Sequence, residues 1–256
     1  MTKIASWNVN SIKVRMPRLI EWLKDVSPDI VLLQEIKTVA DSFPFLELTA
    51  AGYRAVVAGQ KTYNGVAILS RVEPKSVRTS LPGGNADDQA RYIEAEIGDL
   101  TVASIYLPNG NPVGTEKYTY KLDWMERLCR HAAELLKVDR PLILGGDYNV
   151  CPTDDDVYDP AGWKDDALCR KESRAAFRKL VYLGFTDAYR ARHPDARAYT
   201  FWDYQNNAWP QNRGLRIDHL LLSPQAADRL EDSDIDTAPR GKDKASDHTP
   251  VWCALR

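Results

Sequence analysis

The chain has 256 residues, of which 44% are hydrophobic and 27% are charged, and its formal net charge is −2. This composition is typical of a folded globular protein and excludes a disordered or membrane-spanning chain. The small net charge gives no evidence for nucleic-acid binding, so any surface of that kind would have to be a local patch. The N-terminus lacks the apolar core of a signal peptide, and we expect a cytoplasmic protein without membrane contact.

Apolar runs of strand length recur along the chain, and several are continuous rather than alternating, which indicates burial on both faces. Helical spacing of apolar residues predicts three helices between them, over Pro17–Lys24, Lys117–Lys137 and Ser173–Tyr182. The predicted strands are Ile4–Val9, Ile30–Leu33, Val66–Leu69, Tyr92–Ile97, Thr101–Leu107, Leu142–Leu144, Ile217–Leu222 and Thr249–Ala254.

Strands buried on both faces, without a regular β-α-β alternation, predict an α/β four-layer sandwich in which two packed mixed β-sheets are flanked by helices. The chain contains no linker, repeat or low-complexity tract, so we expect one domain over residues 1–256. Turn-rich segments over Pro82–Asn85, Pro108–Pro112 and Asn206–Gly214 are the kind of loop that carries functional side chains.

Cysteine and histidine spacing argues against a soft metal site. The four cysteines form no C-x-x-C pair, and a reduced compartment favours free thiols. The four histidines form no cluster with zinc-ligand spacing.

One segment has the composition of a local nucleic-acid patch. Over Asn207–Arg216, Trp209 and Arg213 are interleaved with asparagine and glutamine. The acidic runs Asp154–Asp156 and Glu231–Asp234 are expected to be solvated loops.

Five short polar motifs each close or open an apolar run. Together they supply carboxylates, amides and an imidazole, which suit a hard cation and a phosphate group. The motifs are Trp7–Asn10, Leu33–Glu35, Gly145–Asn149, Arg216–His219 and Ser246–His248.

The central motif follows the strand predicted at Leu142–Leu144. If extension continues, Asp147 and Asn149 project to one face and Tyr148 to the other. A carboxylate can take a proton from water, while an amide can donate to a developing phosphorane oxygen without adding negative charge. The alternative is a Gly-Gly turn with a local side-chain bond to the backbone.

The other motifs supply possible ligands and a charge pair. Glu35, Asn8 and Asp247 offer oxygen ligands of the kind that Mg²⁺ takes, with Mn²⁺ as a possible substitute. In isolation, Glu35 could instead be a solvated strand end and Asn8 a turn residue. Asp218 could orient His248 and raise its basicity.

In the fourth motif, Asp218 and His219 are consecutive residues of the strand predicted at Ile217–Leu222, where side chains alternate between the two faces. This alternation places His219 on the face opposite Asp218, so His219 is expected to be structural.

At these residues the chain resembles the exonuclease III family of apurinic/apyrimidinic endonucleases, within the endonuclease/exonuclease/phosphatase superfamily. The resemblance covers essentially the full length. Its superfamily elements are Gly146-Asp147-Tyr148-Asn149 and Ser246-Asp247-His248, whereas Tyr106–Asn109 and Thr200–Asp218 are similar to the DNA repair branch.

The resemblance implies a role for each site residue. Glu35 would be the principal metal carboxylate with Asn8 and Asp247 nearby. The catalytic set that it implies is Asp147 as activator of water, Asn149 as transition-state donor, Tyr106 at the phosphate or the leaving oxygen, and His248 on the phosphate, oriented by Asp218. Whether Asp147 or His248 is the general base stays open, because coupled groups titrate as a set.

The family also implies a pocket for an extrahelical deoxyribose without its base, which loses little stacking when flipped. Phe201, Trp202 and Leu215 match the apolar wall, and Asn109 matches the polar group beside it. Without the resemblance, Phe201 and Trp202 would be interpreted as core aromatics. Relatives carry either leucine or a bulkier aromatic residue at position 215, which leaves the pocket size open.

The resemblance therefore implies a metal-dependent hydrolase that cuts 5′ to abasic sites in duplex DNA. It also implies removal of blocked 3′ ends and 3′→5′ exonuclease activity. The sequence shows no obvious interface heptads, so we expect a monomer. The balance of these activities, the number of metals and the oligomeric state stay open. Two alternatives are a phosphodiesterase or phosphatase acting on inositol phosphates, sphingomyelin or RNA, and a DNA-binding protein without catalysis.

Overall fold

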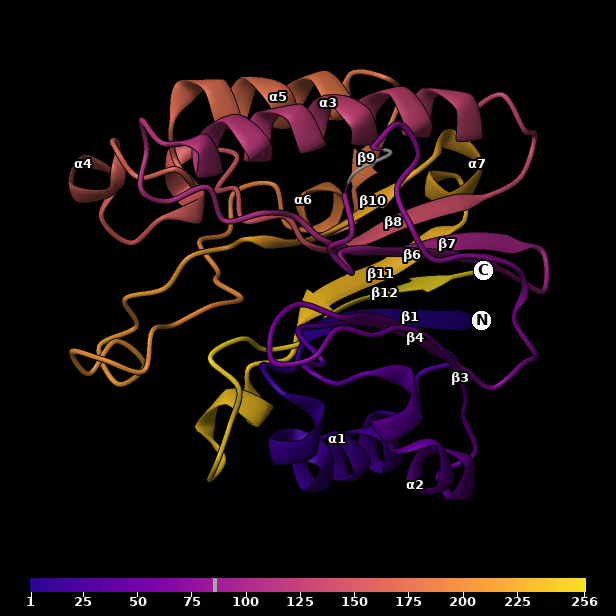
Figure 1. Cartoon of the computed structure of the whole chain (residues 1–256). Coiled ribbons are helices and arrows are strands. Elements are labelled where there is room, and N and C mark those ends of the chain that lie inside the picture. The colour runs from indigo at the N-terminus through magenta and orange to yellow at the C-terminus, as the bar shows by residue number, and fades with distance from the viewer. Residues whose placement is uncertain (85–86) are drawn as a thin grey trace.

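The computed structural model describes residues 1–84 and 87–256, so Asn85, the last residue of one predicted turn, lies outside the described residues. Two six-stranded sheets pack face to face in the middle of the molecule. Helices α3 and α5 (Glu116–Leu135 and Lys171–Val181) cover the outer face of one sheet, and α1 and α2 (Ile12–Val26 and Phe45–Ala50) cover the outer face of the other (Figure 1). This is the predicted four-layer α/β sandwich.

Both sheets are mixed, and each contains one parallel pair, β1 with β2 and β7 with β8. The first sheet has the order β11 (Leu230–Ile235), β12 (Val251–Leu255), β1 (Thr2–Asn8), β2 (Ile30–Gln34), β4 (Val66–Ser70) and β3 (Arg54–Ala58). The second has the order β5 (Lys75–Arg78), β6 (Tyr92–Ile97), β7 (Leu100–Tyr106), β8 (Leu142–Asp147), β10 (Asp218–Leu222) and β9 (Thr186–Asp187).

Short helices occupy the connections between strands. They are α4 (Pro160–Trp163), α6 (Ala188–Arg192), α7 (Pro224–Ala227) and the 3₁₀ turns η1 (Ala40–Ser42), η2 (Asp154–Asp156) and η3 (Ala238–Gly241). Within the described ranges, no helix is both long enough and apolar enough to cross a bilayer.

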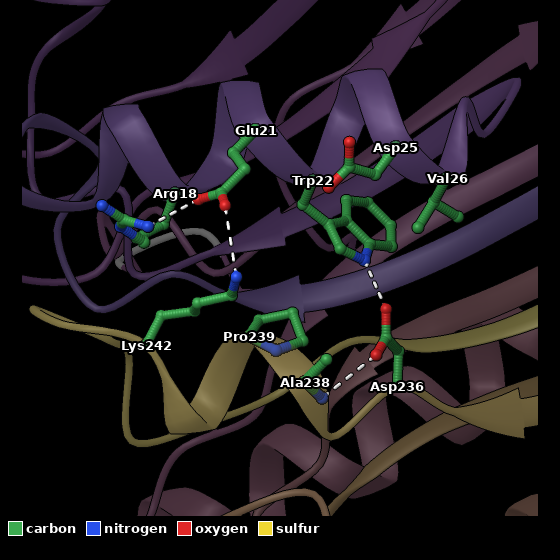
Figure 2. A pocket seen from close by; sticks show the side chains of 9 residues that line it. All are labelled: Arg18, Glu21, Trp22, Asp25, Val26, Asp236, Ala238, Pro239 and Lys242. Atoms are coloured by element: carbon green, nitrogen blue, oxygen red, sulfur yellow. Dashed lines mark hydrogen bonds and ion pairs between the residues drawn. The ribbon is translucent and has the colours of Figure 1, made fainter.

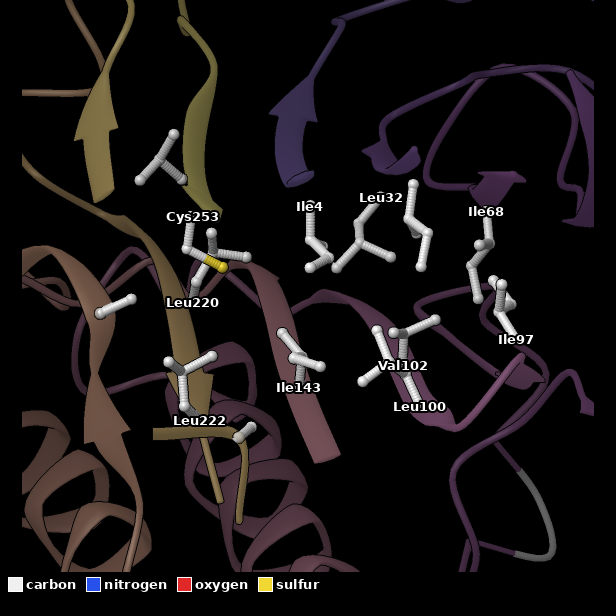
Figure 3. Close-up of a cluster of buried hydrophobic side chains, with 14 of the residues drawn as sticks. Ile4, Leu32, Ile68, Ile97, Leu100, Val102, Ile143, Leu220, Leu222 and Cys253 are labelled. Carbon is white, nitrogen blue, oxygen red and sulfur yellow. The ribbon is translucent and has the colours of Figure 1, made fainter. Parts of the chain in front are cut away.

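The main core lies between the sheets, where side chains from both inner faces meet (Figure 3). Ile4, Leu32 and Ile68 come from the first sheet and pack against Ile143 and Leu220 of the second, each with at most 1% exposure. Burying one such side chain stabilises the fold by about 1.5–3 kcal/mol. Because helices cover the opposite faces, these strands are apolar on both sides, which is why their sequences show continuous runs.

Two consecutive glycines allow β8 to sit close to its neighbours. A Cβ atom at Gly145 would lie 2.5 Å from the Leu32 side chain in the facing sheet, and one at Gly146 would lie 1.9 Å from the Ile105 carbonyl oxygen. The close approach expected of this glycine pair is therefore present. It brings the end of β8 near the ends of β1 and β7.

The boundaries of several elements differ from the sequence prediction. Helix α1 begins at Ile12 and carries Pro17 inside it, because Ile12 is fully buried and its N–H donates to the Ile36 carbonyl. Strands β3, β5, β9 and β11 were not predicted. All four are edge strands; β5, β9 and β11 lack a continuous apolar run, whereas the short apolar run Ala55–Ala58 of β3 was missed. The acidic run Glu231–Asp234 is part of edge strand β11 rather than a loop, with Ser233 buried and its acidic neighbours facing outward.

The other acidic run also departs from expectation, because Asp156 is fully buried. Its Oδ1 accepts a hydrogen bond from Arg216 Nε at 2.7 Å and pairs with Arg190, while its Oδ2 accepts from the Thr153 backbone and hydroxyl. Arg216, 1% exposed, also pairs with Asp187 at 2.8 Å. A buried arginine needs such partners, and sequence spacing alone does not indicate which acid provides them.

Helix α1 is also tied to the segment that leads into the last polar motif. Trp22 Nε1 donates to Asp236 Oδ2 at 2.8 Å, and Lys242 pairs with Glu21 at 3.3 Å, across a cavity of about 210 Å³ (Figure 2). These contacts fix the chain shortly before Ser246, which precedes β12.

The four cysteines are free and buried, as the sequence predicts for a chain without paired C-x-x-C spacing.

Two neighbouring aspartates provide a matched test of the buried network. Asp156→Ala leaves Arg216 and Arg190 without a shared partner, and we expect it to lower the free energy of unfolding by about 3–5 kcal/mol. Asp155→Ala removes only an exposed pair with Arg197 and should cost less than about 1 kcal/mol. Urea denaturation of both variants measures the difference, and equal losses would contradict the role of the network.

Candidate active site

Three strands of the second sheet place polar side chains in one row. In the register of β7, β8 and β10, Tyr106 lies opposite Asp147, and Asp147 lies opposite Asp218. Asp147 and Asp218 are buried, and Tyr106 is partly exposed. The row stands at the strand ends, so these side chains project beyond the hydrophobic core.

The first sheet contributes two side chains to the same place. In the parallel pair β1–β2, Asn8 lies opposite Gln34, and Glu35 follows directly in a left-handed conformation with φ +49°. Asn8 Nδ2 donates to Glu35 Oε1 at 2.9 Å and to Asp147 Oδ2 at 3.0 Å. One buried amide thus joins carboxylates from the two sheets.

His248 completes the group from the segment before β12. Its Nδ1 lies 2.8 Å from Asp218 Oδ2, and its Nε2 lies 3.7 Å from Asp147 Oδ2. Trp7 holds the His248 backbone, since its Nε1 donates to the His248 carbonyl oxygen at 3.2 Å. The potential ligand atoms of Glu35, Asp147 and His248 all lie within 4.8 Å of one another.

The two possible bases shift each other's pKa. Burial alone would lower the pKa of His248, but the Asp218 and Asp147 carboxylates raise that pKa to about 10. Burial raises the pKa of Asp147 to about 7, against the opposing effect of His248. His248 is therefore held as a cation beside Asp147, and the two groups titrate as a coupled pair.

Two neighbours of this group are held in fixed protonation states. Burial works to raise the pKa of the Glu35 carboxyl, but the hydrogen bond from Asn8 and the charge of Lys37 hold that pKa below its usual value. Burial, together with Glu35 and Asp147, raises the pKa of the Tyr106 phenol well above its usual value. Glu35 is thus an anion, and Tyr106 keeps its proton and can donate.

Asn149 does not continue the extended strand, because it has a left-handed φ of +47°. Its backbone N–H donates to Asp147 Oδ1 at 2.9 Å, which is the local side-chain bond considered as an alternative for this motif. Its Nδ2 donates to the Leu107 carbonyl, and its Oδ1 accepts from Asn109 Nδ2 at 3.1 Å. Asn149 still stays beside Asp147, while Tyr148 is buried under α3 and α5, as alternation predicts.

The residues predicted to bind the metal differ in their positions and hydrogen bonds. Asp247 is partly exposed and accepts from Asn10 Nδ2 at 2.9 Å, so it stands beside the Glu35–Asp147 pair rather than within it. Asn8 is oriented as a donor to both carboxylates, and its oxygen accepts from the Asn10 backbone. The free ligand oxygens therefore belong to carboxylates, and Asp147 supplies one that the predicted metal set did not include.

The predicted DNA-contacting residues fall into two groups. Phe201, Leu215 and Arg213 line a cavity of about 410 Å³. Trp202 is 2% exposed and packs against Tyr199 and Trp209, so it lies behind the cavity wall, as expected for a core aromatic.

Three site residues were missed by the sequence prediction. Asn10 and Lys37 connect Asp247 with Glu35, because Lys37 pairs with Glu35 Oε2 at 2.9 Å and also donates to the Asn10 side chain. Lys121 on α3 is fully buried and donates to the Asn149 carbonyl at 2.6 Å and to the Asn109 carbonyl at 3.0 Å. Helical spacing already places Lys121 on the apolar face, four residues before Met125, and that signal could have identified it.

His219 has the structural role expected of it. It is fully buried, its Nε2 lies 2.9 Å from the Val150 carbonyl, and its Nδ1 lies 3.1 Å from the Arg216 guanidinium.

The sequence model of the Endonuclease/Exonuclease/phosphatase family matches residues 5–248. This span contains all five polar motifs and every strand except β12 and the first residues of β1. The chain belongs to the Endonuclease/Exonuclease/phosphatase family.

Full-length relatives within the family are nucleases. Exodeoxyribonuclease III of Haemophilus influenzae is 33% identical, and the alignment covers 99% of this chain and 100% of that protein. The DNA repair nuclease APEX1 of Danio rerio is 33% identical over 99% of this chain and 82% of that protein.

Solved structures agree with these relatives. An AP endonuclease from Archaeoglobus fulgidus is 39% identical with a TM-score of 0.96, covering 100% of this chain and 99% of that chain. A 3′ phosphatase from Neisseria, bound to a product DNA hairpin, is 39% identical with a TM-score of 0.98, and both chains are covered completely. The resemblance and the fold inferred from the sequence are confirmed.

The charge pair at the centre of the site sets a pH dependence. Asp218→Asn removes the charge that keeps His248 protonated, and we expect the pKa of His248 to fall by at least about one unit. Because the folded-state pKa lies above the ordinary value of 6.5, the pair stabilises the fold fully below pH 6.5, and this contribution is lost as the pH rises through about 10.

NMR titration of the histidine rings in metal-free protein measures this shift. Asp234→Asn, which removes an exposed carboxylate 4.0 Å from His193, is the control and should leave His248 unchanged. An unaltered His248 titration in Asp218→Asn would contradict the assignment.

Proposed function

We propose that this chain is a DNA repair phosphodiesterase that hydrolyses the bond 5′ to an abasic site in duplex DNA. The same site would remove 3′-blocking groups and, in the 3′→5′ direction, terminal nucleotides. The full-length similarity to exodeoxyribonuclease III, an AP endonuclease and a 3′ phosphatase supports this range of activities. The same similarity favours DNA over inositol phosphates, sphingomyelin or RNA as the substrate. We propose that the protein acts as a monomer.

The observation that carries the proposal is the position of Asp147 between the Asn8 amide and the cationic His248 ring. In the proposed reaction Asp147 accepts a proton from a water molecule, and the water oxygen attacks phosphorus. The bond from phosphorus to the 3′ oxygen of the upstream sugar breaks, and that oxygen takes up a proton. The products are a 3′-hydroxyl and a 5′-deoxyribose phosphate.

The other side chains would stabilise charge on the phosphate. His248, kept protonated by Asp218, would bind a non-bridging oxygen through Nε2. Tyr106 would donate its phenolic proton in a hydrogen bond to the phosphate or to the departing oxygen. Asn149 is oriented by Asn109 and the Leu107 carbonyl, and one amide hydrogen remains to donate to the phosphate.

The donor set fits a hard divalent ion. Glu35 would be the principal ligand, with Asp147 and the Asp247 carboxylate nearby, and carboxylate oxygens with few nitrogen ligands favour Mg²⁺, with Mn²⁺ as a substitute. When bound, such an ion neutralises phosphate charge and stabilises the departing oxyanion. Arg213, exposed at the rim of the 410 Å³ cavity, would contact the DNA backbone, while Trp209 would support the loop that carries it.

Cleavage of an end-labelled duplex with one abasic site tests the proposal. Asp147→Asn removes the proton acceptor, and we expect the rate with Mg²⁺ to fall by about 10²–10⁴-fold. The control variant Asp165→Asn changes an exposed aspartate that pairs with Arg170, and it should cleave at the wild-type rate.

Circular dichroism of both variants controls for folding. Wild-type cleavage that persists in excess chelator, or near-normal cleavage by folded Asp147→Asn, would contradict the mechanism.

A further inference from the structure

Lys121 carries a buried amine that has no part in the proposed reaction. The residue has 0% exposure and lies on the same face of α3 as the buried Trp124 and Met125. Burial lowers the pKa of its ammonium group to about 7, against the opposing charges of Asp147 and Asp166. Because desolvating an amine is costly, its hydrogen-bond partners matter.

The Lys121 amine joins the two turns that leave β7 and β8. Its Nζ donates to the Asn109 carbonyl at 3.0 Å and to the Asn149 carbonyl at 2.6 Å. The two strands are parallel neighbours, and their last residues, Tyr106 and Asp147, lie opposite each other. One donor therefore holds both turns directly beyond the reaction centre. A neutral amine still has two N–H bonds, so both hydrogen bonds can persist in either protonation state.

The backbone of both turns is shaped around this contact. Asn149 has a left-handed φ of +47°, and Gly110, directly after Asn109, has a φ of +90°. A Cβ atom at Gly110 would lie 2.6 Å from Lys121 Cδ. The glycine thus leaves the space in which the lysine side chain reaches the two carbonyls.

The same two turns carry the amides beside Asp147. Asn109 Nδ2 donates to Asn149 Oδ1 at 3.1 Å, and Asn149 Nδ2 donates to the Leu107 carbonyl at 2.9 Å. The Asn149 backbone N–H donates to Asp147 Oδ1 at 2.9 Å. A displacement of the Asn149 backbone would therefore move the amide proposed to bind the phosphate and would disturb the hydrogen bond to Asp147.

We propose that Lys121 is a positioning residue for phosphodiester hydrolysis, which holds Asn149 and Asn109 in the orientation that the reaction requires. The inference rests on the proposed phosphodiesterase function. Because the amine is fully buried, it is not available to contact a DNA phosphate, which is the usual role of lysine in DNA binding. Lys121 acts instead through two backbone carbonyls, and a misplacement of about 1 Å can lower a rate by about 10²-fold.

The test is cleavage of a duplex with one abasic site by Lys121→Met, which removes the donor and keeps a side chain of similar length. We expect the single-turnover rate with Mg²⁺ to fall by about 10–100-fold. The dissociation constant for the duplex, measured in chelator, should stay within about three-fold of wild type, because the phosphate contacts lie elsewhere. Lys121→Arg retains N–H donors and should restore most of the rate.

Lys179→Met is the matched control, because Lys179 is 58% exposed and pairs only with Glu126 on the neighbouring helix α3. It should leave both the rate and the dissociation constant unchanged.

A double-mutant cycle decides whether the effect passes through Asn149. Asn149→Ala removes the oriented amide, so adding Lys121→Met should lower the rate by less than about three-fold further. A double variant whose loss equals the product of the two single losses would overturn the inference. A wild-type rate in folded Lys121→Met, or a loss of DNA affinity as large as the loss of rate, would also overturn it.

Thermal unfolding of each variant shows whether a loss reflects misfolding. If Lys121→Met does not fold, Lys121→Gln takes its place in the cycle with the same expected outcomes, since its side chain is polar but too short to reach both carbonyls. Each of the contradicting outcomes would leave the phosphodiesterase function intact. A wild-type protein that cleaves no DNA would instead contradict the proposed function.

Discussion

The site depends on one contact between the two sheets, the Asn8 amide that donates to both Glu35 and Asp147. Two carboxylates this close, one buried and one partly buried, would repel each other and would be costly to desolvate. The shared donor, the cationic His248 and the Lys37 ammonium offset that cost. The glycines of β8 permit the approach, because side chains there would collide with the facing sheet and with β7.

A second buried network, made of charged side chains, lies next to the start of β10, the strand that carries Asp218. Arg216, two residues before Asp218, is fixed by Asp156 and Asp187, and it contacts His219. The start of β10 is therefore held by ion pairs as well as by strand pairing. Since Asp218 orients His248, the stability of this network and the position of the imidazole are linked.

The sequence predicts the fold and most of the site because the same constraint produces both. Strands buried on two faces give continuous apolar runs, and polar groups can follow only where those strands end, so Asn8, Glu35 and Asp147 are recognisable. Features that depend on tertiary contacts cannot be recognised from the sequence in this way. Asp156 resembles its solvated neighbours until Arg216 is placed beside it. Trp202 is assigned to a pocket wall by the family resemblance, whereas its packing on Trp209 fits the core position that its residue type alone indicates. Edge strand β11 has a polar sequence because one face is solvated.

We propose that side chains from the two sheets form one binding site for a divalent ion. Titration of the protein with Mn²⁺, followed by electron paramagnetic resonance of the free ion, tests this proposal most directly. We expect tight binding in wild type and a large loss of affinity in Glu35→Gln, with no change in Glu73→Gln, whose carboxylate is 67% exposed. Equal binding by wild type and Glu35→Gln would contradict the proposed site.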